Sequence, residues 1–266
     1  MKKYFFTFLL LFFSIQMMQG QVLISLLLGN KLNSGKLVFG LDGGANFSNI
    51  SNIDPSKYKS GFNIGFYFDI LLKEKKSWYL HTGVIVKSPM GAKDLNPYSL
   101  NDPDLDSLFS NGSVDRKIRY YNVPILIKYQ FKNRMFVELG PMLGLLARKS
   151  YDEFYTDINS SKDLTYKRDL IDEYNRIDVG LEAGIGYQFH AHHGMYFAAR
   201  YYQGLRNVTK EKPANPQLNS SFYLVVGIPI GASERAQEKA KEKAKARAEK
   251  KAEKQKEKKS KKNPDI

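Results

Sequence analysis

The sequence predicts an all-β protein, namely an eight-stranded antiparallel up-and-down transmembrane β-barrel with a signal peptide and a basic helical or disordered C-terminal tail. Three observations predict this fold. Apolar residues recur with a period of two, the opposite faces of the same segments mix charges with repeated glycines, and long polar connections alternate with short ones. A helix cannot use a period of two, so these segments are predicted to be strands.

The clearest pair of strands lies within residues 117–146. From residue 123 to 131 every second residue is apolar or aromatic, beginning with Val123 and ending with Phe131. After a turn of about four residues, the alternation resumes between Val137 and Leu145. This stretch therefore predicts a β-hairpin.

Six more segments show the same alternation, and with the hairpin they bring the expected number of strands to eight. They are residues 37–48, 61–70, 78–88, 177–189, 195–203 and 222–230. Residues 177–189 are the sharpest example, because large apolar residues alternate there with glycine, Asp178 and Glu182.

The connections between these segments alternate in length. Residues 49–60, 89–116, 149–176 and 204–221 are long and polar, whereas residues 71–77, 132–134 and 190–194 are short. Outer-membrane barrels keep short periplasmic turns at one end and longer external loops at the other. The alternation therefore favours such a barrel, with both chain ends on the periplasmic side.

The alternative is a soluble eight-stranded barrel of the lipocalin type, in which the apolar face would point inward. Repeated glycines on the polar face argue against it, since a narrow membrane-barrel lumen needs small residues beside long ones. Aromatic residues at the strand ends, such as Trp78, Tyr129 and Phe189, are typical of membrane-interface girdles. We therefore expect the apolar face to point toward lipid.

The two ends of the chain differ from the strands between them. Lys2 and Lys3 precede an apolar run from Tyr4 to Ile15, and Gly20 then offers a small residue at a cleavage point. This is a signal-peptide layout, and residues 1–20 are assigned to it. The barrel is expected over residues 36–231, followed by a Lys-, Ala- and Glu-rich periplasmic tail over residues 232–266. The chain has no cysteine, and the tail carries half of its formal net charge of +14. Ala is the only apolar residue type over most of the tail, so a solvated helix or a disordered arm is expected there.

Several motifs along the predicted strands match a known pattern. They are GLDGGANFS at residues 40–48, GFNIGF at 61–66, NVPILIKY at 122–129, ELGPMLG at 138–144 and RYYQGLRN at 200–207. Together they resemble the PorT-like outer-membrane β-barrels of Bacteroidota. The resemblance covers residues 36–231 and omits the tail. It implies a barrel in the cell outer membrane, and the family's namesake implies a link to protein secretion.

The inward face gathers charges of both signs. They are Asp42, Asp69, Lys87, Lys128, Glu138, Asp178, Glu182 and Arg200. Eight strands enclose only enough space for side chains, so these groups are expected to form a structural network of ion pairs that fills the lumen. A proton or ion path is the alternative.

Other motifs point only weakly to chemistry. Asp102, Asp104 and Asp106 resemble the start of a calcium loop, but Ser107 and Ser113 stand where glycine and glutamate are required. His190, His192 and His193 fit a turn better than a metal site. His81 with Ser88 is the nearest approach to a catalytic Ser-His pair. We expect no enzymatic activity, cofactor or metal.

The expected function is that of a structural or interaction protein, with external loops and a basic tail that contact partners. The alternative is an accessory component of a protein-secretion apparatus in the outer membrane. The expected partners are outer-membrane lipid, together with envelope proteins or cell wall for the tail. The basic composition would suit nucleic acid, but export excludes that partner.

Overall fold

The computed structural model describes residues 36–72, 77–147, 150–157, 164–190, 194–211 and 214–230. Apart from Ile230, they belong to one compact unit, Lys36–Pro229. The signal peptide and the basic tail predicted from the sequence lie outside the described residues. Within those ranges, no helix is long and apolar enough to cross a membrane.

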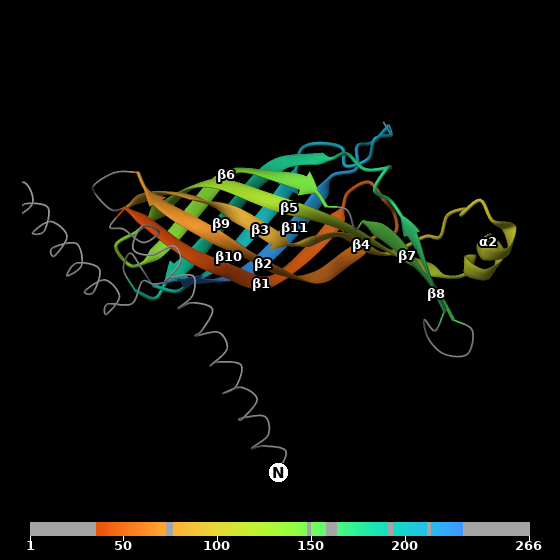
Figure 1. The fold of residues 1–266 in the computed structure, drawn as a ribbon, viewed down its shortest axis with the longest axis horizontal. Helices are drawn as coiled ribbons and strands as arrows, with labels where there is room; N and C mark the ends of the chain where they lie inside the picture. The colour runs from red at the N-terminus through yellow and green to blue at the C-terminus, as the bar shows by residue number, and fades with distance from the viewer. Residues whose placement is uncertain are drawn as a thin grey trace, which may run out of the picture. The chain divides into compact units, whose positions relative to one another are not determined.

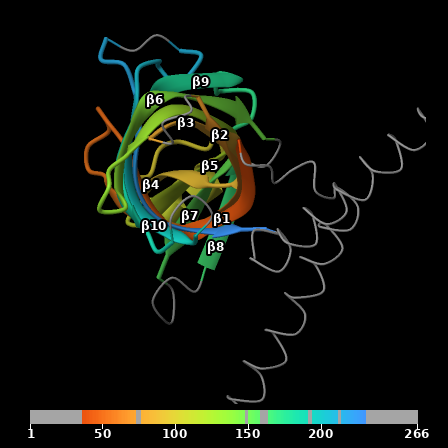
Figure 2. The same ribbon diagram turned by 90° about the vertical axis from the view of Figure 1, so that its left-hand side faces the viewer.

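Eight strands form a closed antiparallel barrel (Figures 1 and 2). Their bounds are β1 Leu37–Ile50, β2 Lys57–Leu71, β3 Trp78–Lys87, β5 Ser113–Gln130, β6 Met135–Leu146, β9 Ile177–Gln188, β10 Tyr196–Gly204 and β11 Asn219–Pro229. The order is β3-β2-β1-β11-β10-β9-β6-β5, and β3 pairs with β5 to close the ring. The predicted eight-stranded antiparallel barrel is confirmed, as is the hairpin of β5 and β6 with its turn at residues 131–134.

Lipid-facing and lumen-facing residues alternate as the sequence predicts. Tyr129, Ile127 and Ile125 of β5 lie on the exterior, while Lys128 and Leu126 are buried inside. The exterior carries a large set of exposed apolar side chains, including Ile64, Leu139, Leu181, Ile185 and Phe197. Such a continuous apolar surface requires lipid around it.

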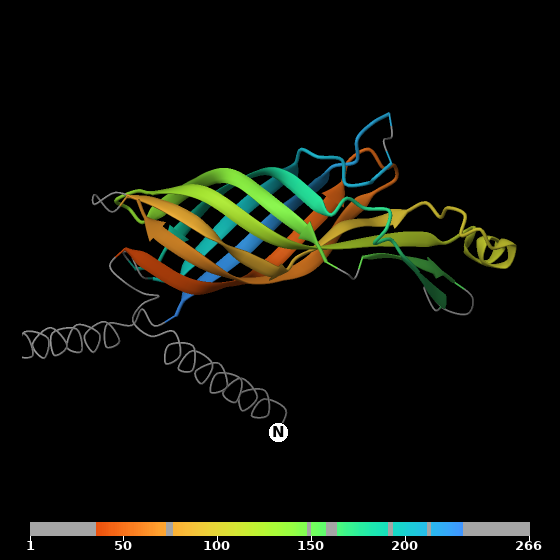
Figure 3. The same cartoon turned by 45° about the horizontal axis from the view of Figure 1, so that its top comes forward.

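Beyond one end of the barrel, the sheet continues into an extension, which Figure 3 shows clearly. The extension consists of β4 Pro89–Leu95, the first residues of β5, β7 Tyr151–Thr156, β8 Leu164–Asp169 and the helix α2 Pro103–Phe109. β4 pairs with β5, β5 with β7, and β7 with β8. Val114, Phe109 and Phe154 are buried in the extension and belong to the same apolar cluster as barrel residues such as Ile50 and Tyr120.

Residues 89–116 and 149–176, which the sequence predicts as long polar connections, contain β4, α2, β7 and β8. Buried and partly exposed residues alternate along β7, and the buried ones are Asp152, Phe154 and Thr156. Because two of these three are polar, the sequence shows no alternation of apolar residues there. The connection predicted at residues 49–60 is also shorter than expected, because β1 runs to Ile50 and β2 begins at Lys57. The short connections all remain at the opposite end, which we call the short-turn end; the extension lies at the long-connection end.

The start of β4 enters the barrel mouth instead of running over its surface. Its first four residues are buried. Asn46 Nδ2 on the lumen side of β1 donates to the carbonyl oxygen of Pro89 at 2.7 Å, and Ser88 Oγ lies 3.1 Å from Tyr223 OH. β4 therefore covers part of the lumen at the long-connection end.

The depth of lipid burial can be tested with two equally exposed leucines. Leu139 is 60% exposed in the middle of β6, and Leu205 is 61% exposed just after the end of β10. Leu139→Arg should lower the free energy of unfolding in lipid vesicles by about 2–4 kcal/mol, and Leu205→Arg by about 0–1 kcal/mol. Urea titration of both variants in the same vesicles measures the difference. Equal losses for the two variants would contradict the assignment of the apolar face to lipid.

Candidate functional site

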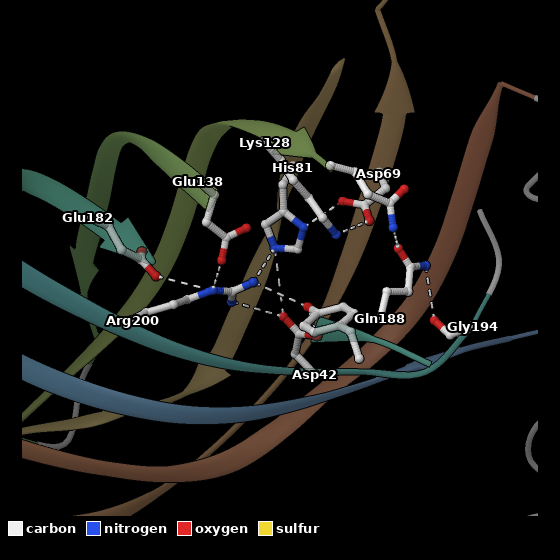
Figure 4. A network of polar contacts seen from close by, with 11 residues as sticks. Asp42, Asp69, His81, Lys128, Glu138, Glu182, Gln188, Gly194 and Arg200 are labelled. Atoms are coloured by element: carbon white, nitrogen blue, oxygen red, sulfur yellow. Dashed lines mark hydrogen bonds and ion pairs between the residues drawn. The ribbon is translucent and has the colours of Figure 1, made fainter. Parts of the chain in front are cut away.

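The centre of the lumen holds a cluster of buried charged and aromatic side chains, shown in Figure 4. Arg200 on β10 lies at the middle of the cluster and is only 1% exposed. Its Nε donates to Glu138 Oε1 on β6 at 2.5 Å, and its Nη1 donates to Asp42 Oδ2 on β1 at 3.3 Å. Oε1 of Glu182 on β9 lies 3.7 Å from Arg200 Nε. One guanidinium thus connects four strands of the barrel.

A second group in the same cluster is built around Asp69 on β2. Lys128 Nζ on β5 donates to Asp69 Oδ2 at 2.8 Å, and His81 Nδ1 on β3 lies 2.7 Å from Asp69 Oδ1. The Lys128 ammonium also lies over the rings of Phe136 and Tyr196, at 4.1 and 4.8 Å from their centroids. Carboxylate and aromatic faces therefore both stabilise this buried cation.

His81 joins the two groups. Its Nε2 lies 3.0 Å from Arg200 Nη2, and arginine can only donate hydrogen bonds. Nε2 is therefore the acceptor, which leaves the proton on Nδ1 to be donated to Asp69. The imidazole is 0% exposed and stacks on Tyr67 at 5.5 Å between ring centroids. This geometry assigns His81 a connecting role between the two groups.

Glycines make the space that these large side chains need. A Cβ at Gly184 would lie 2.9 Å from Arg200 Cγ and 3.0 Å from Glu138 Oε1. A Cβ at Gly227 would overlap the ring of Tyr196, whose hydroxyl donates to Asp42 Oδ1 at 2.5 Å. Some of the repeated glycines of the lumen face, such as Gly184 and Gly227, are thus places where a ring or a guanidinium approaches the neighbouring strand.

The structure brings together six of the eight residues predicted for the lumen network. They are Asp42, Asp69, Lys128, Glu138, Glu182 and Arg200. Asp178 is also buried but lies apart from them, where its Oδ2 accepts from Asn219 Nδ2 at 2.8 Å.

The prediction that Lys87 faces the lumen is wrong. The pairing of β2 with β3 changes register between Ile64 and Gly65, so that Ile64 lies opposite Lys87 while Gly65 lies opposite Ile85. This bulge inserts Val86 as an extra residue and reverses the face of everything after it. Lys87 is therefore exposed on the exterior, with its Nζ 5.4 Å from the centroid of the Phe62 ring.

Sequence reasoning missed His81, Tyr196 and Tyr67 as members of the lumen cluster. Each of the three lies an even number of positions along its strand from a residue that the sequence places inside. The alternation therefore predicts that they face the lumen as well. Ser88, which was weighed as a partner of His81, instead contacts Tyr223. The carboxylates of the calcium-like segment serve local turns: Asp102 caps α2, and Asp106 accepts from the Leu100 amide and the Ser99 hydroxyl.

The extension has a buried ion pair of its own. Arg116 donates from Nε to Asp152 Oδ1 at 2.9 Å and from Nη2 to Asp152 Oδ2 at 2.6 Å. Tyr98 OH donates to the same Asp152 at 2.8 Å. Burial and the neighbouring Asp152 raise the pKa of Tyr98 to about 12. The extension is thus held by a specific polar core as well as by apolar packing.

Comparison with known proteins agrees with this architecture. Residues 25–210 match the family described as outer membrane protein β-barrel domain. The chain belongs to this outer-membrane β-barrel family. It is therefore a protein of the cell outer membrane, and its barrel lies in a lipid environment. No match was found among curated proteins.

Solved structures with a similar strand arrangement include three outer-membrane proteins. Ail, the attachment invasion locus protein of Yersinia pestis, is 16% identical, with a TM-score of 0.36, over 73% of this chain and 98% of Ail. Neisserial surface protein A is 12% identical, with a TM-score of 0.34, over 71% and 96% of the two chains. OprG from Pseudomonas aeruginosa is 13% identical, with a TM-score of 0.32, over 73% and 93%.

Replacement of Arg200 tests the lumen cluster. Arg200→Met should lower the free energy of unfolding by about 3–5 kcal/mol, because it leaves buried carboxylates without their cation. Glu182→Gln is the matched control: its oxygens have no hydrogen-bond partner among the described residues, so the change should be neutral or stabilising. Urea unfolding in vesicles measures both. A milder loss for Arg200→Met than for Glu182→Gln would contradict the central role of the guanidinium.

A second pair of variants tests the extension. Arg116→Met breaks a buried pair. It should lower the free energy of local opening of β7 and β8, measured by hydrogen exchange, by about 3–5 kcal/mol. Arg168→Met removes a more exposed ion pair with Glu173, so it should lower the same free energy of local opening by only about 0–1 kcal/mol. The β5–β6 hairpin within the membrane should exchange equally slowly in both variants. Similar exchange of β7 and β8 in the two variants would refute the structural importance of the Arg116–Asp152 pair.

Proposed function

We propose that this protein is a closed outer-membrane barrel of structural or interaction type, whose folded extension contacts partners outside the membrane. The observation that carries the proposal is the Arg200 cluster, which fills the middle of the lumen with hydrogen-bonded side chains. A barrel filled in this way supports and positions other parts of the molecule instead of conducting solutes.

Obstructions at three heights of the lumen support a closed barrel. The Arg200 cluster occupies its centre, and β4 enters its mouth at the long-connection end. Toward the short-turn end, Gln130 Nε2 donates to Gln188 Oε1 at 2.6 Å, and Gln188 Nε2 donates to the Gly194 carbonyl oxygen at 3.2 Å. A solute would have to break all three sets of contacts to pass.

The extension supports an interaction role. Short periplasmic turns and longer external segments are the rule in outer-membrane barrels, so the extension is assigned to the cell exterior. Its β8 strand pairs only with β7, which leaves one strand edge of the described sheet available to a partner. A strand edge supported by a packed core is a defined contact surface, unlike a set of irregular loops.

A component of a protein-secretion apparatus is the second candidate. The motifs at residues 122–129 and 138–144, which form the β5–β6 hairpin, support it through their resemblance to PorT-like barrels. The tail beyond residue 231 supports contact with envelope proteins or cell wall through its positive charge. A secretion defect on deletion of the gene, rescued by the full chain, would favour this candidate over a purely structural role.

Planar-bilayer recording tests the closed barrel. Purified protein with confirmed heat-dependent gel migration should give no stepwise ion conductance, because the lumen is filled at three heights. A channel-forming outer-membrane porin serves as the positive control. Reproducible stepwise conductance by the unmodified chain would refute the closed-barrel proposal.

The interaction role is tested by removing the β7–β8 hairpin. Replacing residues 151–169 by a short Gly-Ser linker should abolish cross-links from whole cells to the partner, while the barrel remains folded. Shortening residues 211–216, in the connection between β10 and β11, is the matched control and should keep those cross-links. An unchanged cross-linking pattern after loss of the hairpin would contradict a contact role for the extension.

A further inference from the structure

The exterior face of β5 changes character as the strand leaves the membrane. Going outward, this face presents Ile127, Ile125, Val123 and Tyr121, and then Arg119 and Lys117. Tyr121 is well exposed and ends the apolar stretch, as an interface aromatic does. The two basic residues therefore follow directly above the aromatic boundary of the membrane-spanning surface.

Lys87 adds a third cation at this boundary. Ile85 of β3 pairs with Asn122 of β5, so Lys87, two residues farther along β3, comes level with residues 119–121. The bulge at Val86 turns Lys87 to the exterior, where it lies beside Phe62. A cation is thus placed outward among lipid-facing residues by a specific backbone irregularity.

These three cations differ from several basic residues farther out in the extension. Lys59 Nζ lies 2.9 Å from Asp115 Oδ2, and Lys167 Nζ lies 3.1 Å from Glu153 Oε1. Lys87, Lys117 and Arg119 have no carboxylate within ion-pair distance in the described part of the chain. Lys117 instead lies over the ring of Tyr151, at 5.8 Å from its centroid. Three basic groups beside the lipid-facing surface therefore lack a carboxylate partner in the described part of the chain.

We propose that Lys87, Lys117 and Arg119 form a binding surface for the phosphate groups of a phosphorylated glycolipid in the outer leaflet. Long basic side chains keep their stems on apolar surface while the charged ends reach the head-group region. Clustered cations there attract anionic head groups, and arginine can bind a phosphate with two parallel hydrogen bonds. Phe62 and Tyr121 would lie against the upper part of the acyl chains.

The choice of the outer leaflet follows from the position of the surface. It adjoins the extension at the long-connection end, which the proposed function places outside the cell. The proposal goes beyond that function, because it names a lipid partner for the barrel wall and does not depend on whether the lumen conducts or the extension binds a protein.

The experiment compares lipids that differ only in phosphate. The full chain in detergent micelles is titrated with bisphosphorylated lipid A and with the same lipid after removal of its phosphates, and bound lipid is measured by native mass spectrometry. The variants are the triple change Lys87→Gln, Lys117→Gln and Arg119→Gln, and the control Lys167→Gln. Heat-dependent gel migration confirms that each variant is folded.

We expect the unmodified chain to bind the phosphorylated lipid about tenfold or more tightly than the dephosphorylated form, and the triple variant to lose about a hundredfold in affinity for it. Lys167→Gln should change the affinity by less than about twofold, because Glu153 already neutralises its charge, although Lys167 lies over the same Tyr151 ring as Lys117. If the triple variant does not fold, Lys87→Gln alone should weaken binding about fivefold. The proposal is overturned if both lipids bind equally, if the folded variants keep full affinity, or if Lys167→Gln weakens binding as much as Lys87→Gln.

Discussion

Closing a sheet of only eight strands leaves an interior that side chains must fill, and the rest of this structure depends on that constraint. Large residues fit into so narrow a lumen only where the neighbouring strand carries a glycine opposite them. Gly184 and Gly227 provide that space for Arg200 and Tyr196. The alternation of glycine with charged and aromatic residues, which is the most unusual feature of the sequence, is therefore a packing requirement of the barrel.

Filling the lumen with charged groups also determines which residues have to act together. Arg200 contacts carboxylates from β1, β6 and β9, and His81 connects it to Asp69 on β2 and so to Lys128 on β5. Each buried charge would be costly alone, and together the charges tie strands that are not neighbours in the ring. The same contacts that stabilise the barrel obstruct a path through it, so stability and a closed lumen have one physical origin.

The outside of the barrel follows a different constraint, which is the change from hydrocarbon to head groups along each strand. β5 shows this within one segment: its exterior face passes from Ile127 through Tyr121 to Arg119, while its interior face stays buried throughout. The extension begins above that boundary, and there β5 acquires new neighbours in β4 and β7. A single long strand thus connects the membrane-embedded wall to the folded part outside.

The sequence by itself determined the period of two, the number of barrel strands, the face that meets lipid and most members of the lumen cluster, because each of these depends on alternation along one strand. Tertiary structure decided what depends on contacts between distant segments. The bulge at Val86 places Lys87 on the exterior of the barrel. Asp152 is buried in β7, although the sequence of that segment looks like a polar connection. The start of β4 lies at the barrel mouth. A bulge is defined by the partner strand, and a polar residue is acceptable inside only when its partner is present, as Arg116 is for Asp152. Neither condition can be read from one segment of the chain alone.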